Sequence, residues 1–388
     1  MNVFQTYAWV QRKLGEVSNF RRGSFPQPYG LPEWYDEENG MPFVQVVDVS
    51  NNLRLVDDTK QKISERAQPK SVYVPEGRVV VTLQGSIGRV AITQYPSYVD
   101  RTLLIFEDYT TETDAYYWAY VIQQKFDIEK QTAPGGTIKT ITKEVLSDFE
   151  VSLPCISEQT AIGDFFRTLD TTITLHKRKL DRLKKLKMGY LQQMFPQSGE
   201  SVPKMRFDGF ADVWKEQRLT DMASITMGQS PDSVNYTENP NDHILVQGNA
   251  DMKNGTVVPR VWTTQVTKIA NRGDLVLSVR APVGDVGKTE YDIVLGRGVA
   301  GIKGNEFIYQ TLVRMKMFGY WERIIQGSTF ESINSNDLKE AMIYSPSEAE
   351  QTRIGNFFRC LDKKIASQSH KTEQLKKLKT AYLQKMFV

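Results

Sequence analysis

The sequence predicts an α+β protein built by tandem duplication, in which two mixed domains are each followed by a long helix. The first observation is a repeat, because residues 158–195 and 350–387 are identical at about 22 of 38 positions without a gap. The second is that the regions before the repeats alternate β-rich runs with turn residues, without a regular strand–helix–strand rhythm. The third is a set of weaker upstream matches, whose offset falls from about 205 to about 192 residues. The second copy has therefore lost residues inside its variable region, where loops absorb changes in length.

Length and composition restrict the class of protein. A chain of 388 residues exceeds one ordinary core, and 40% hydrophobic with 24% charged residues indicates folded domains. No run of about 18 apolar residues is present, and the N-terminus does not resemble a secretory signal. We therefore expect a cytoplasmic protein with no membrane contact. Cys155 and Cys360 lack CxxC or His neighbours, which predicts neither a disulfide framework nor a metal site.

Each variable region is interpreted as a mixed domain of about 150 residues. Residues 71–83 and 273–279 have the β-branched content and the Gly or Pro boundaries of strands. Residues 116–126 and 309–325 have apolar residues at helical spacing. Strands and helices mixed in this way are typical of α+β domains.

Short motifs in these regions give no support for catalysis. The glycine-containing stretches at 85–90 and 281–287 do not fit GxGxxG, so we interpret them as strand-to-strand turns and not as phosphate-binding loops. NPND at 239–242 is interpreted as a turn, because it lacks the second Pro and the aromatic residue of an amino-methyltransferase motif. No P-loop, HExxH or metal-ligand cluster occurs, and three His give little material for a triad. The sequence predicts a binding protein with no cofactor and no catalytic residue.

Each repeated segment is expected to form one long helix that buries a single seam. Apolar residues recur every three or four positions, and Lys occupies the other faces. Pro196 ends the first helix, and Ser347 with Glu350 fits a capping box at the start of the second. The apolar stripe continues through Leu186 and Leu378. The expected seam residues are Ile162, Phe166, Leu169, Ile173, His176, Leu180, Leu183, Ile354, Phe358, Leu361, Ile365, Gln368 and Leu375.

Two such helices, packed as an antiparallel coiled coil, would hold two domains apart with approximate two-fold symmetry. About 36 helical residues at roughly 1.5 Å each give a rod of about 55 Å. His176, Gln368 and Thr372 interrupt the seam, and they are either partly solvated or fix the register between the helices. Domain and helix alternate, with predicted boundaries at 1–153, 154–196, 197–345 and 346–388.

Positive charge lies on the repeats and not on the variable regions. Residues 158–195 hold 8 Lys and Arg against 4 Asp and Glu, and residues 350–388 hold 9 against 3. Residues 1–150 hold 16 against 20, and residues 196–349 hold 16 against 19. The basic helix residues either form a solvated exterior or meet an acidic partner or DNA phosphates. They are Lys177, Arg178, Lys179, Lys184, Lys185, Lys187, Lys376, Lys377 and Lys379.

Together these features resemble the specificity subunit of type I restriction–modification systems. The resemblance is carried by the tandem plan, by the EQxxIxxFFxxLD openings at 158–170 and 350–362, and by the LKKLKxxYLQxMF endings. Gly-Gly-Thr and Gly-Ser-Thr lead-ins at 135–146 and 327–338 also match. The segment VPKMRFDGFADVWKEQRL at 202–219 resembles the one that introduces a target-recognition domain in this family. The first half departs from the pattern, because nothing like KMRFDGF precedes its matching Trp.

The resemblance implies that each variable region is a target-recognition domain for one half of a bipartite DNA sequence. The long helices would set the unread spacer and dock two methyltransferase subunits, which use S-adenosylmethionine to methylate adenine. An ATP-driven restriction subunit can join. The chain itself would be non-catalytic, and its partners would be double-stranded DNA and the methyltransferase and restriction subunits. Because the two variable regions differ, the target should be asymmetric.

Base edges are read by Arg, Lys, Asn and Gln, whereas small donors suffice for phosphates. We expect such contacts from loops at repeat-matched positions. Arg280 is the strongest single candidate, since one Arg facing guanine is worth about 1–3 kcal/mol of discrimination. Any of these side chains could instead be an exposed structural residue of its loop. The candidate DNA-binding residues are Arg21, Arg22, Ser24, Gln84, Ser86, Arg89, Thr137, Gln229, Ser230, Arg280, Ser328 and Thr329.

Two other classes of function were weighed against this one. The acidic variable regions fit a protein-only scaffold that carries two binding modules on a coiled-coil spacer. A fused methyltransferase would need a glycine-rich cofactor loop and an Asn/Asp-Pro-Pro-aromatic motif, and the sequence has neither. Binding that depends on salt and on DNA sequence separates the specificity subunit from the scaffold. The acidic balance also predicts that tight DNA binding requires the methyltransferase subunits.

Overall fold

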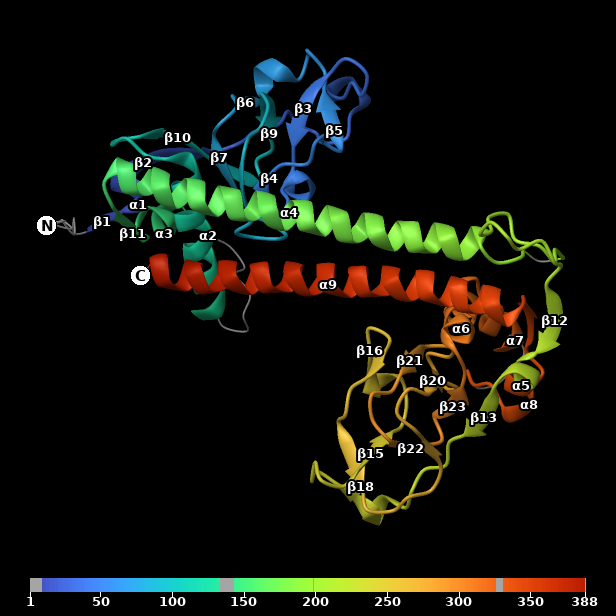
Figure 1. Cartoon of the computed structure of the whole chain (residues 1–388). Coiled ribbons are helices and arrows are strands. Elements are labelled where there is room, and N and C mark those ends of the chain that lie inside the picture. Colours follow the sequence, from blue (N-terminus) through green and yellow to red (C-terminus); the bar gives the residue numbers. More distant parts are fainter. Residues whose placement is uncertain (1–8, 133–142, 198, 326–330, 388) are drawn as a thin grey trace, which may run out of the picture. The chain divides into compact units, whose positions relative to one another are not determined.

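The computed structural model describes residues 9–132, 143–197, 199–325 and 331–387 (Figure 1). The chain divides into two compact units. Unit 1 comprises Met1–Lys177 with Lys371–Val388, and unit 2 comprises Arg178–His370. Each unit therefore combines one α+β domain with segments of both long helices. In the part of the chain that the structure describes, no helix is both long and apolar enough to cross a membrane.

The domain of unit 1 is built from two sheets and a covering helix. The five-stranded sheet has the order β2-β10-β7-β8-β4, and the four-stranded sheet has the order β5-β3-β9-β6. A separate pair, β1 with β11, is antiparallel. The strands are β1 (Val10–Lys13), β2 (Ser18–Arg22), β3 (Met41–Val44), β4 (Leu53–Arg54), β5 (Gln61–Ile63), β6 (Val72–Val74), β7 (Val79–Thr82), β8 (Val90–Ile92), β9 (Ser97–Val99), β10 (Leu103–Tyr109) and β11 (Glu150–Leu153). The helices are α1 (Leu14–Val17), α2 (Ala115–Thr132) and α3 (Lys143–Ser147), with 3-10 turns at Pro32–Trp34, Val46–Asp48 and Gln68–Lys70.

The domain of unit 2 repeats this plan with different lengths. Its sheets have the orders β13-β23-β20-β21-β17-β16 and β14-β18-β15-β22-β19, and β12 pairs with β24. The strands are β12 (Lys215–Arg218), β13 (Ser224–Met227), β14 (Tyr236–Thr237), β15 (His243–Val246), β16 (Met252–Lys253), β17 (Thr256–Val257), β18 (Val261–Thr263), β19 (Ile269–Ala270), β20 (Leu275–Ser278), β21 (Val286–Lys288), β22 (Ile293–Leu295), β23 (Val299–Lys303) and β24 (Met342–Ser345). The helices are α5 (Leu219–Met222), α6 (Glu306–Met317), α7 (Tyr320–Ile325) and α8 (Ser335–Lys339), with 3-10 turns at Ser233–Asn235 and Asn249–Asp251.

The predicted elements are confirmed, and one of them is divided in two. The strands expected at 71–83 and 273–279 are β6, β7 and β20, and the helix expected at 116–126 is α2. The stretch at 309–325 is helical as expected, but Gly319 adopts a φ of +70° and divides it into α6 and α7. A left-handed residue of this kind ends a helix, and glycine adopts it at little cost.

The interpretation of the two glycine-containing stretches as turns is also confirmed. They join the antiparallel pairs β7–β8 and β20–β21. Gly88 in the first turn packs closely on Phe126 of α2, and Gly284 in the second packs on Trp321 of α7. A side chain at either position would collide with the ring, so these glycines allow the helices to approach the sheets. The turns are therefore part of the core packing.

The repeated segments form the long helices α4 (Ile156–Gln193) and α9 (Glu348–Met386). In unit 1, the start of α4 runs beside the end of α9, and the Phe165 and Tyr382 ring centroids are 5.1 Å apart. In unit 2, the end of α4 runs beside the start of α9, and the Tyr190 and Phe357 rings are 5.0 Å apart. Within each unit the two helices are therefore antiparallel neighbours.

The buried face of the helices differs in part from the expected seam. Its continuation through Leu186 and Leu378 is wrong, since these side chains are 45% and 44% exposed. A helix turns once in about 3.6 residues, so steps of three drift off the buried face. Among the expected seam residues, Ile162, Phe166, Leu169, Leu180, Ile354, Phe358, Leu361 and Gln368 are buried, and Ile173, His176, Leu183, Ile365 and Leu375 are half-buried. Gln368 and Thr372 are only 8% and 3% exposed, so the partly solvated alternative is wrong for them.

Each unit has a junction where the end of one long helix packs on the start of the other and on the domain helix. In unit 1, Phe387 stacks on Tyr117 of α2 with ring centroids 5.5 Å apart. The Asp170 carboxylate accepts a hydrogen bond from the Tyr120 hydroxyl, also on α2. It also forms an ion pair with Lys379 Nζ at 2.7 Å. Burial and the Asp170 charge raise the pKa of Tyr120, so the phenol stays protonated and donates.

The junction of unit 2 is built in the same way from the other repeat. Phe195 stacks on Phe307 of α6 with ring centroids 5.4 Å apart. Asp362 accepts from Gln310 Nε2 at 2.8 Å and from Lys187 Nζ at 2.6 Å. Lys187 and Lys379 are therefore part of the helix packing, and both alternatives stated for the basic helix residues are wrong for these two.

Candidate nucleic-acid interface

In the first domain, three loops converge beside the turn that follows β7. The Leu83 N–H donates to Thr102 O at 2.8 Å, so Gln84 lies next to the 100–102 loop. A Cβ on Gly85 would lie 3.6 Å from Val46 Cγ1, which brings the 45–47 loop to the same place. We call residues 45–47, 83–86 and 100–102 the first three-loop surface. A cavity of 560 Å³ opens there, lined by Tyr29, Gln45, Val46, Val47, Lys60, Gln61, Asp100, Arg101 and Thr102.

Asp100 organises this cavity. It accepts a hydrogen bond from the Tyr29 hydroxyl and another from the Thr102 N–H at 2.9 Å. Burial and the bond to Asp100 raise the pKa of Tyr29, so this phenol is a neutral donor at physiological pH. The Arg101 guanidinium lies 5.1 Å from the Tyr29 ring centroid and is exposed. The first three-loop surface therefore presents Arg101 and Gln84 to solvent, next to the Tyr29 ring.

The second domain has a matching convergence of loops. The Val279 N–H donates to Gly298 O at 2.9 Å, which places Arg280 beside the 296–298 loop. The Gly296 N–H donates to Val246 O at 2.8 Å, so residues 247–248 lie at the same place. We call residues 247–248, 279–281 and 296–298 the second three-loop surface. Arg280 and Arg297 are both exposed there.

A shared backbone contact shows that the two surfaces are equivalent. Gly23 packs against the carbonyls of Val99 and Asp100, and Gly228 packs against the carbonyl of Gly296, which corresponds to Asp100. Any side chain at either glycine would overlap these carbonyls, so the residue type is fixed by the approach. The framework is therefore the same in both domains, while the exposed side chains differ.

The structure gives the sequence-predicted residues different surroundings. Gln84 and Arg280 are exposed on the first and second three-loop surfaces, and Gln229 is exposed on the loop after β13. The Ser24 hydroxyl donates to Lys70 O at 3.1 Å, and the Ser230 hydroxyl accepts from the Arg297 N–H at 3.2 Å. Both hydroxyls therefore hold a loop in place.

The other candidates lie on the sheet edge, in the turn after β7 or outside the described residues. Arg21 lies on the edge strand β2 and pairs with Glu107 at 2.5 Å, and Arg22 follows it. The Thr82 hydroxyl donates to Ser86 O at 2.5 Å and accepts from the Arg89 N–H at 3.0 Å. Three candidates, Thr137, Ser328 and Thr329, lie outside the described residues.

Sequence reasoning missed Arg101 and Arg297, which occupy matched positions in the two domains. Both follow the loop that contacts Gly23 or Gly228, and both are exposed. The local sequences VDRT and LGRG share only the Arg, so identity was too low for the repeat to reveal the match. The match is seen only in the structure, where β10 pairs with β7 in the first domain and β23 pairs with β20 in the second.

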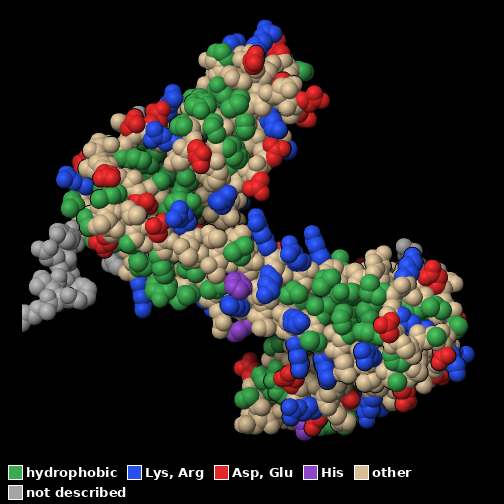
Figure 2. All heavy atoms as spheres, turned by 45° about the horizontal axis from the view of Figure 1, so that its top comes forward, with side chains coloured by type: hydrophobic (Ala, Val, Ile, Leu, Met, Phe, Trp, Pro, Cys, Tyr) green, Lys and Arg blue, Asp and Glu red, His purple; other side chains and the backbone are tan. Residues whose placement is uncertain are grey.

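Neither domain carries a continuous basic surface on the face in view. Figure 2 shows acidic and basic side chains intermixed over both domains. This agrees with the excess of Asp and Glu over Lys and Arg in the variable regions. Non-specific DNA affinity depends on the number of phosphates neutralised. Neither domain is therefore suited to strong non-specific binding by itself.

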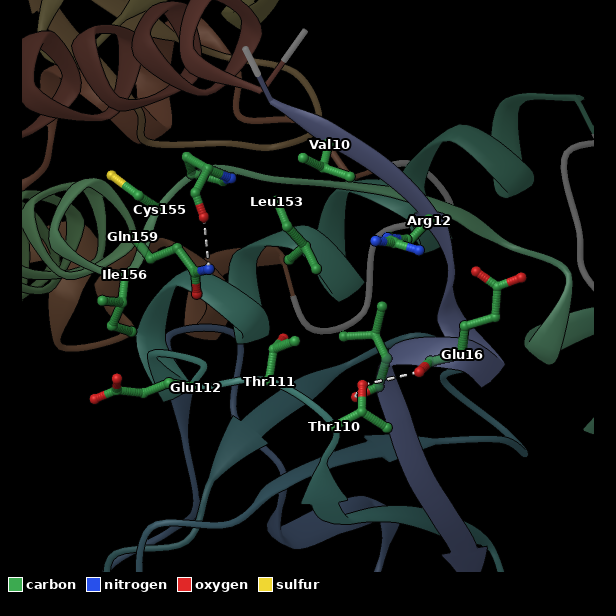
Figure 3. Close-up of a pocket in the computed structure, with 12 residues that line it drawn as sticks. Val10, Arg12, Glu16, Thr110, Thr111, Glu112, Leu153, Cys155, Ile156 and Gln159 are labelled. Atoms are coloured by element: carbon green, nitrogen blue, oxygen red, sulfur yellow. Dashed lines mark hydrogen bonds between the residues drawn. The ribbon is translucent and has the colours of Figure 1, made fainter. Parts of the chain in front are cut away.

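A second cavity of unit 1, of 510 Å³, lies where α4 begins (Figure 3). Arg12 and Glu16 line one side, and Thr110, Thr111 and Glu112 line another. The Cys155 thiol is exposed, and hydrogen bonds from the Ser157 hydroxyl and the Glu158 N–H lower its pKa. Among the described residues no group of three His, Cys, Asp or Glu is placed to hold a metal ion.

Comparison with known proteins connects this geometry to a family. The family model of the type I restriction modification DNA specificity domain matches residues 7–185 and 212–377. A protein of Methanocaldococcus jannaschii, provisionally named the MjaX type I restriction enzyme specificity subunit, is 27% identical over 96% of this chain and 91% of its own length. A second protein of that organism, the MjaIX specificity subunit, is 27% identical over 31% of this chain and 29% of its own length.

Solved structures share the fold. The S subunit of a type I restriction–modification system from M. genitalium aligns with a TM-score of 0.69 at 14% identity, covering 100% of this chain and 98% of its own. A chain from a study of complex assembly and conformational transition of a type I system aligns with a TM-score of 0.57 at 22% identity, over 98% and 97%. Because the family model matches both halves of the sequence, the chain belongs to the family of type I restriction–modification specificity subunits.

Proposed function

We propose that this chain reads a bipartite, asymmetric sequence in double-stranded DNA. Residues 1–153 and 197–345 are the two target-recognition domains, and residues 154–196 and 346–388 are the spacer helices. The observation that carries the proposal is that the two three-loop surfaces stand on one framework yet present different side chains. A shared framework with divergent exposed loops is what two readers of different half-sites require.

The side chains on these surfaces are suited to base edges. The first presents Gln84 and Arg101 beside Gln45, and the second presents Arg280 and Arg297 beside Gln247. Arg can donate two hydrogen bonds to guanine, and Gln can bond the adenine edge, each worth about 1–3 kcal/mol of discrimination. We therefore expect guanine contacts in both half-sites, from Arg101 in the first and from Arg280 and Arg297 in the second.

The long helices set the distance between the half-sites. A helix of 38 residues, the length of α4, extends roughly 57 Å. Two major-groove sites one turn apart are separated by roughly 34–36 Å. The helices form an antiparallel coiled coil with approximate two-fold symmetry, and the matched junctions of the two units support this arrangement. The unread spacer in the target therefore has a fixed length.

The exposed basic residues of α4 and α9 dock the methyltransferase subunits. Lys184, Lys185, Lys376 and Lys377 are exposed and suit an acidic partner surface. Two methyltransferase subunits use S-adenosylmethionine to methylate adenine, and restriction subunits join this complex. The chain contributes recognition and no catalytic residue.

The test is to co-express this chain with a methyltransferase subunit from the same kind of system and map methylated adenines by single-molecule sequencing. The expected result is one two-part asymmetric motif with a fixed gap. A complex that co-purifies and binds S-adenosylmethionine yet methylates no motif would contradict the proposal and favour the scaffold alternative.

The acidic balance of the domains makes a further prediction about affinity. We expect the chain alone to bind its target weakly at physiological salt, and the complex with methyltransferase subunits to bind it tightly. Fluorescence anisotropy with a labelled duplex that contains the mapped motif measures both. Tight binding by the isolated chain would show that the partner subunits are dispensable for affinity.

A further inference from the structure

In unit 2, a short segment before the domain is clamped onto the two long helices. The Arg206 guanidinium donates through Nε and Nη2 to the Glu350 carboxylate, each at 2.7 Å. The Met205 N–H donates to Gln193 O at 2.9 Å. The Phe207 ring lies 5.9 Å from the Phe357 ring at 75°. We call residues 205–207 the clamp segment.

The Arg206–Glu350 pair replaces one half of the capping box that was expected at the start of α9. The Glu350 N–H contacts the Ser347 hydroxyl at 3.5 Å, as one half of a capping box. The Glu350 carboxylate, which the sequence pattern assigned to the other half, instead accepts both bonds from Arg206. The side chain of Glu350 is 1% exposed, so the guanidinium is its compensating charge.

Two of the matched positions in unit 1 line a cavity of 650 Å³. An offset of 192 residues relates Glu350 to Glu158, Gln193 to Lys385 and Phe357 to Phe165. The cavity is lined by Trp9, Glu158, Ile162, Lys385 and Met386. Glu158 is half-buried and accepts from Trp9 Nε1 at 3.2 Å. The Phe165 side chain remains 40% exposed.

The sequence before the first domain does not supply the same chemistry. Residues 1–8 are MNVFQTYA and contain no Arg and no Lys. A guanidinium for Glu158 therefore has no source in this stretch. The first unit repeats the receiving side of the clamp, with its carboxylate and its aromatic ring, whereas Met1 and Asn2 stand at the positions that correspond to Arg206 and Phe207 at the Trp9–Trp214 offset of 205.

We propose that this cavity of unit 1 is a docking site for a segment of a partner protein that carries Arg followed by an aromatic residue. The guanidinium pairs with Glu158 through two parallel hydrogen bonds, which is the strongest geometry for this charge pair. The aromatic side chain of the segment packs on Phe165, and the methylene groups of its Arg lie on Ile162 and Met386. Lys385 is exposed at the rim, where water screens its repulsion of the incoming guanidinium. The proposal is independent of DNA reading.

The test uses the full chain and a labelled peptide of the sequence SVPKMRFDGFADV, which copies residues 201–213. Fluorescence anisotropy should show saturable binding. Replacing the peptide's Arg by Gln should weaken it about tenfold or more, and Glu158→Gln in the chain should do the same. Glu112→Gln, an exposed carboxylate of the same unit outside this cavity, is the matched control and should leave binding unchanged.

A second measurement locates the peptide. A photoreactive group in place of its first Phe should crosslink to Phe165 or to the 382–386 stretch of α9. Crosslinking elsewhere, or equal affinity for the Glu158→Gln and parent chains, would overturn the proposal. Binding that appears only after residues 2–8 are removed would assign the cavity to the chain's own first residues, and would overturn it too. Circular dichroism on each variant confirms that the helices are intact.

Discussion

The two helix–domain junctions and the two three-loop surfaces have diverged to very different extents. At the junctions, an aromatic ring stacks on the domain helix, and a partly buried Lys–Asp pair lies beside it in both units. At the three-loop surfaces, the backbone contacts match, but Gln84 stands where Arg280 stands in the other copy. The junctions hold the same two helices in each unit, so their chemistry is constrained from both sides.

The junction residues can be substituted only with compensating changes, whereas the exposed residues of the three-loop surfaces can be substituted one at a time. Residues such as Phe166 and Phe358 contact a helix and a domain at once, so a substitution would need compensation in both. The side chains of Arg280 and Gln84 are exposed, so replacing either should leave the fold intact. Target specificity can therefore change in one half without disturbing the other.

The largest expected effect comes from removing the buried ring at each junction. Phe166→Ala and Phe358→Ala each delete a side chain with 0% exposure and should lower local stability by about 3–5 kcal/mol. Hydrogen exchange resolved by peptide should show the loss in unit 1 for the first variant and in unit 2 for the second. Phe165→Ala, next to Phe166 and 40% exposed, is the control with a small effect. A loss spread evenly over both units would break the comparison.

The clamp segment should distinguish the two units. Arg206→Ala leaves the buried Glu350 carboxylate without its partner and should destabilise unit 2 by about 3–5 kcal/mol. The double variant Arg206→Ala with Glu350→Gln should recover much of the lost stability, because it has no unpaired buried charge. Arg218→Ala, which breaks an exposed pair with Glu340, should have little effect. Thermal unfolding monitored in unit 2 measures all three.

The three-loop surfaces should respond in recognition and not in stability. Arg280→Ala should relax one position of one half-site by about 1–3 kcal/mol of discrimination, and Gln84→Ala should affect only the other half-site. Methylation mapping of each variant complex gives the altered motif. Arg272→Ala, an exposed Arg of the same domain outside this surface, should leave the motif unchanged. A change in both half-sites from a single variant would mean that the domains do not read independently.

The ion pairs at the junctions should give the smallest effects and should be equal. Lys379→Met and Lys187→Met remove largely buried pairs with Asp170 and Asp362, and each should cost about 1–2 kcal/mol. Raising the salt concentration should change these losses less than it changes the effect of an exposed pair, because these pairs are partly shielded from solvent. Lys13→Met breaks an exposed pair with Asp148 and is the control without a measurable change. Chemical denaturation followed in each unit compares the two.

Sequence patterns predicted the duplicated plan and the long helices because those features depend on local periodicity. The drift of the buried face past Leu186 and Leu378 was not predicted, since it depends on where the partner helix lies. Lys187 and Lys379 looked like surface residues because their partners are 175 and 209 residues away. Both repeats have the same Asp and the same Lys, at Asp170 and Asp362 and at Lys187 and Lys379. Aligning the two repeat sequences in antiparallel orientation would therefore have predicted both ion pairs.

The surface residues were harder to predict. Gln84 and Arg280 followed from the turn after a strand, whose sequence signal is local. Arg101 and Arg297 join them through backbone bonds between segments far apart in the chain, and no sequence pattern near either residue indicates this. Ser24 and Ser230 had the right position and residue type, but their hydroxyls are used to hold loops.

The composition of unit 1 has a consequence for the order in which the protein is made. Its core includes Leu383, Met386 and Phe387, which are translated only after the whole of unit 2. At about 5–20 residues per second, the intervening 193 residues take roughly 10–40 s, during which Phe166 and Tyr120 lack part of their covering. A chain interrupted before its last helix would keep this apolar surface exposed. The core of unit 1 is therefore completed only when the end of α9 has been made.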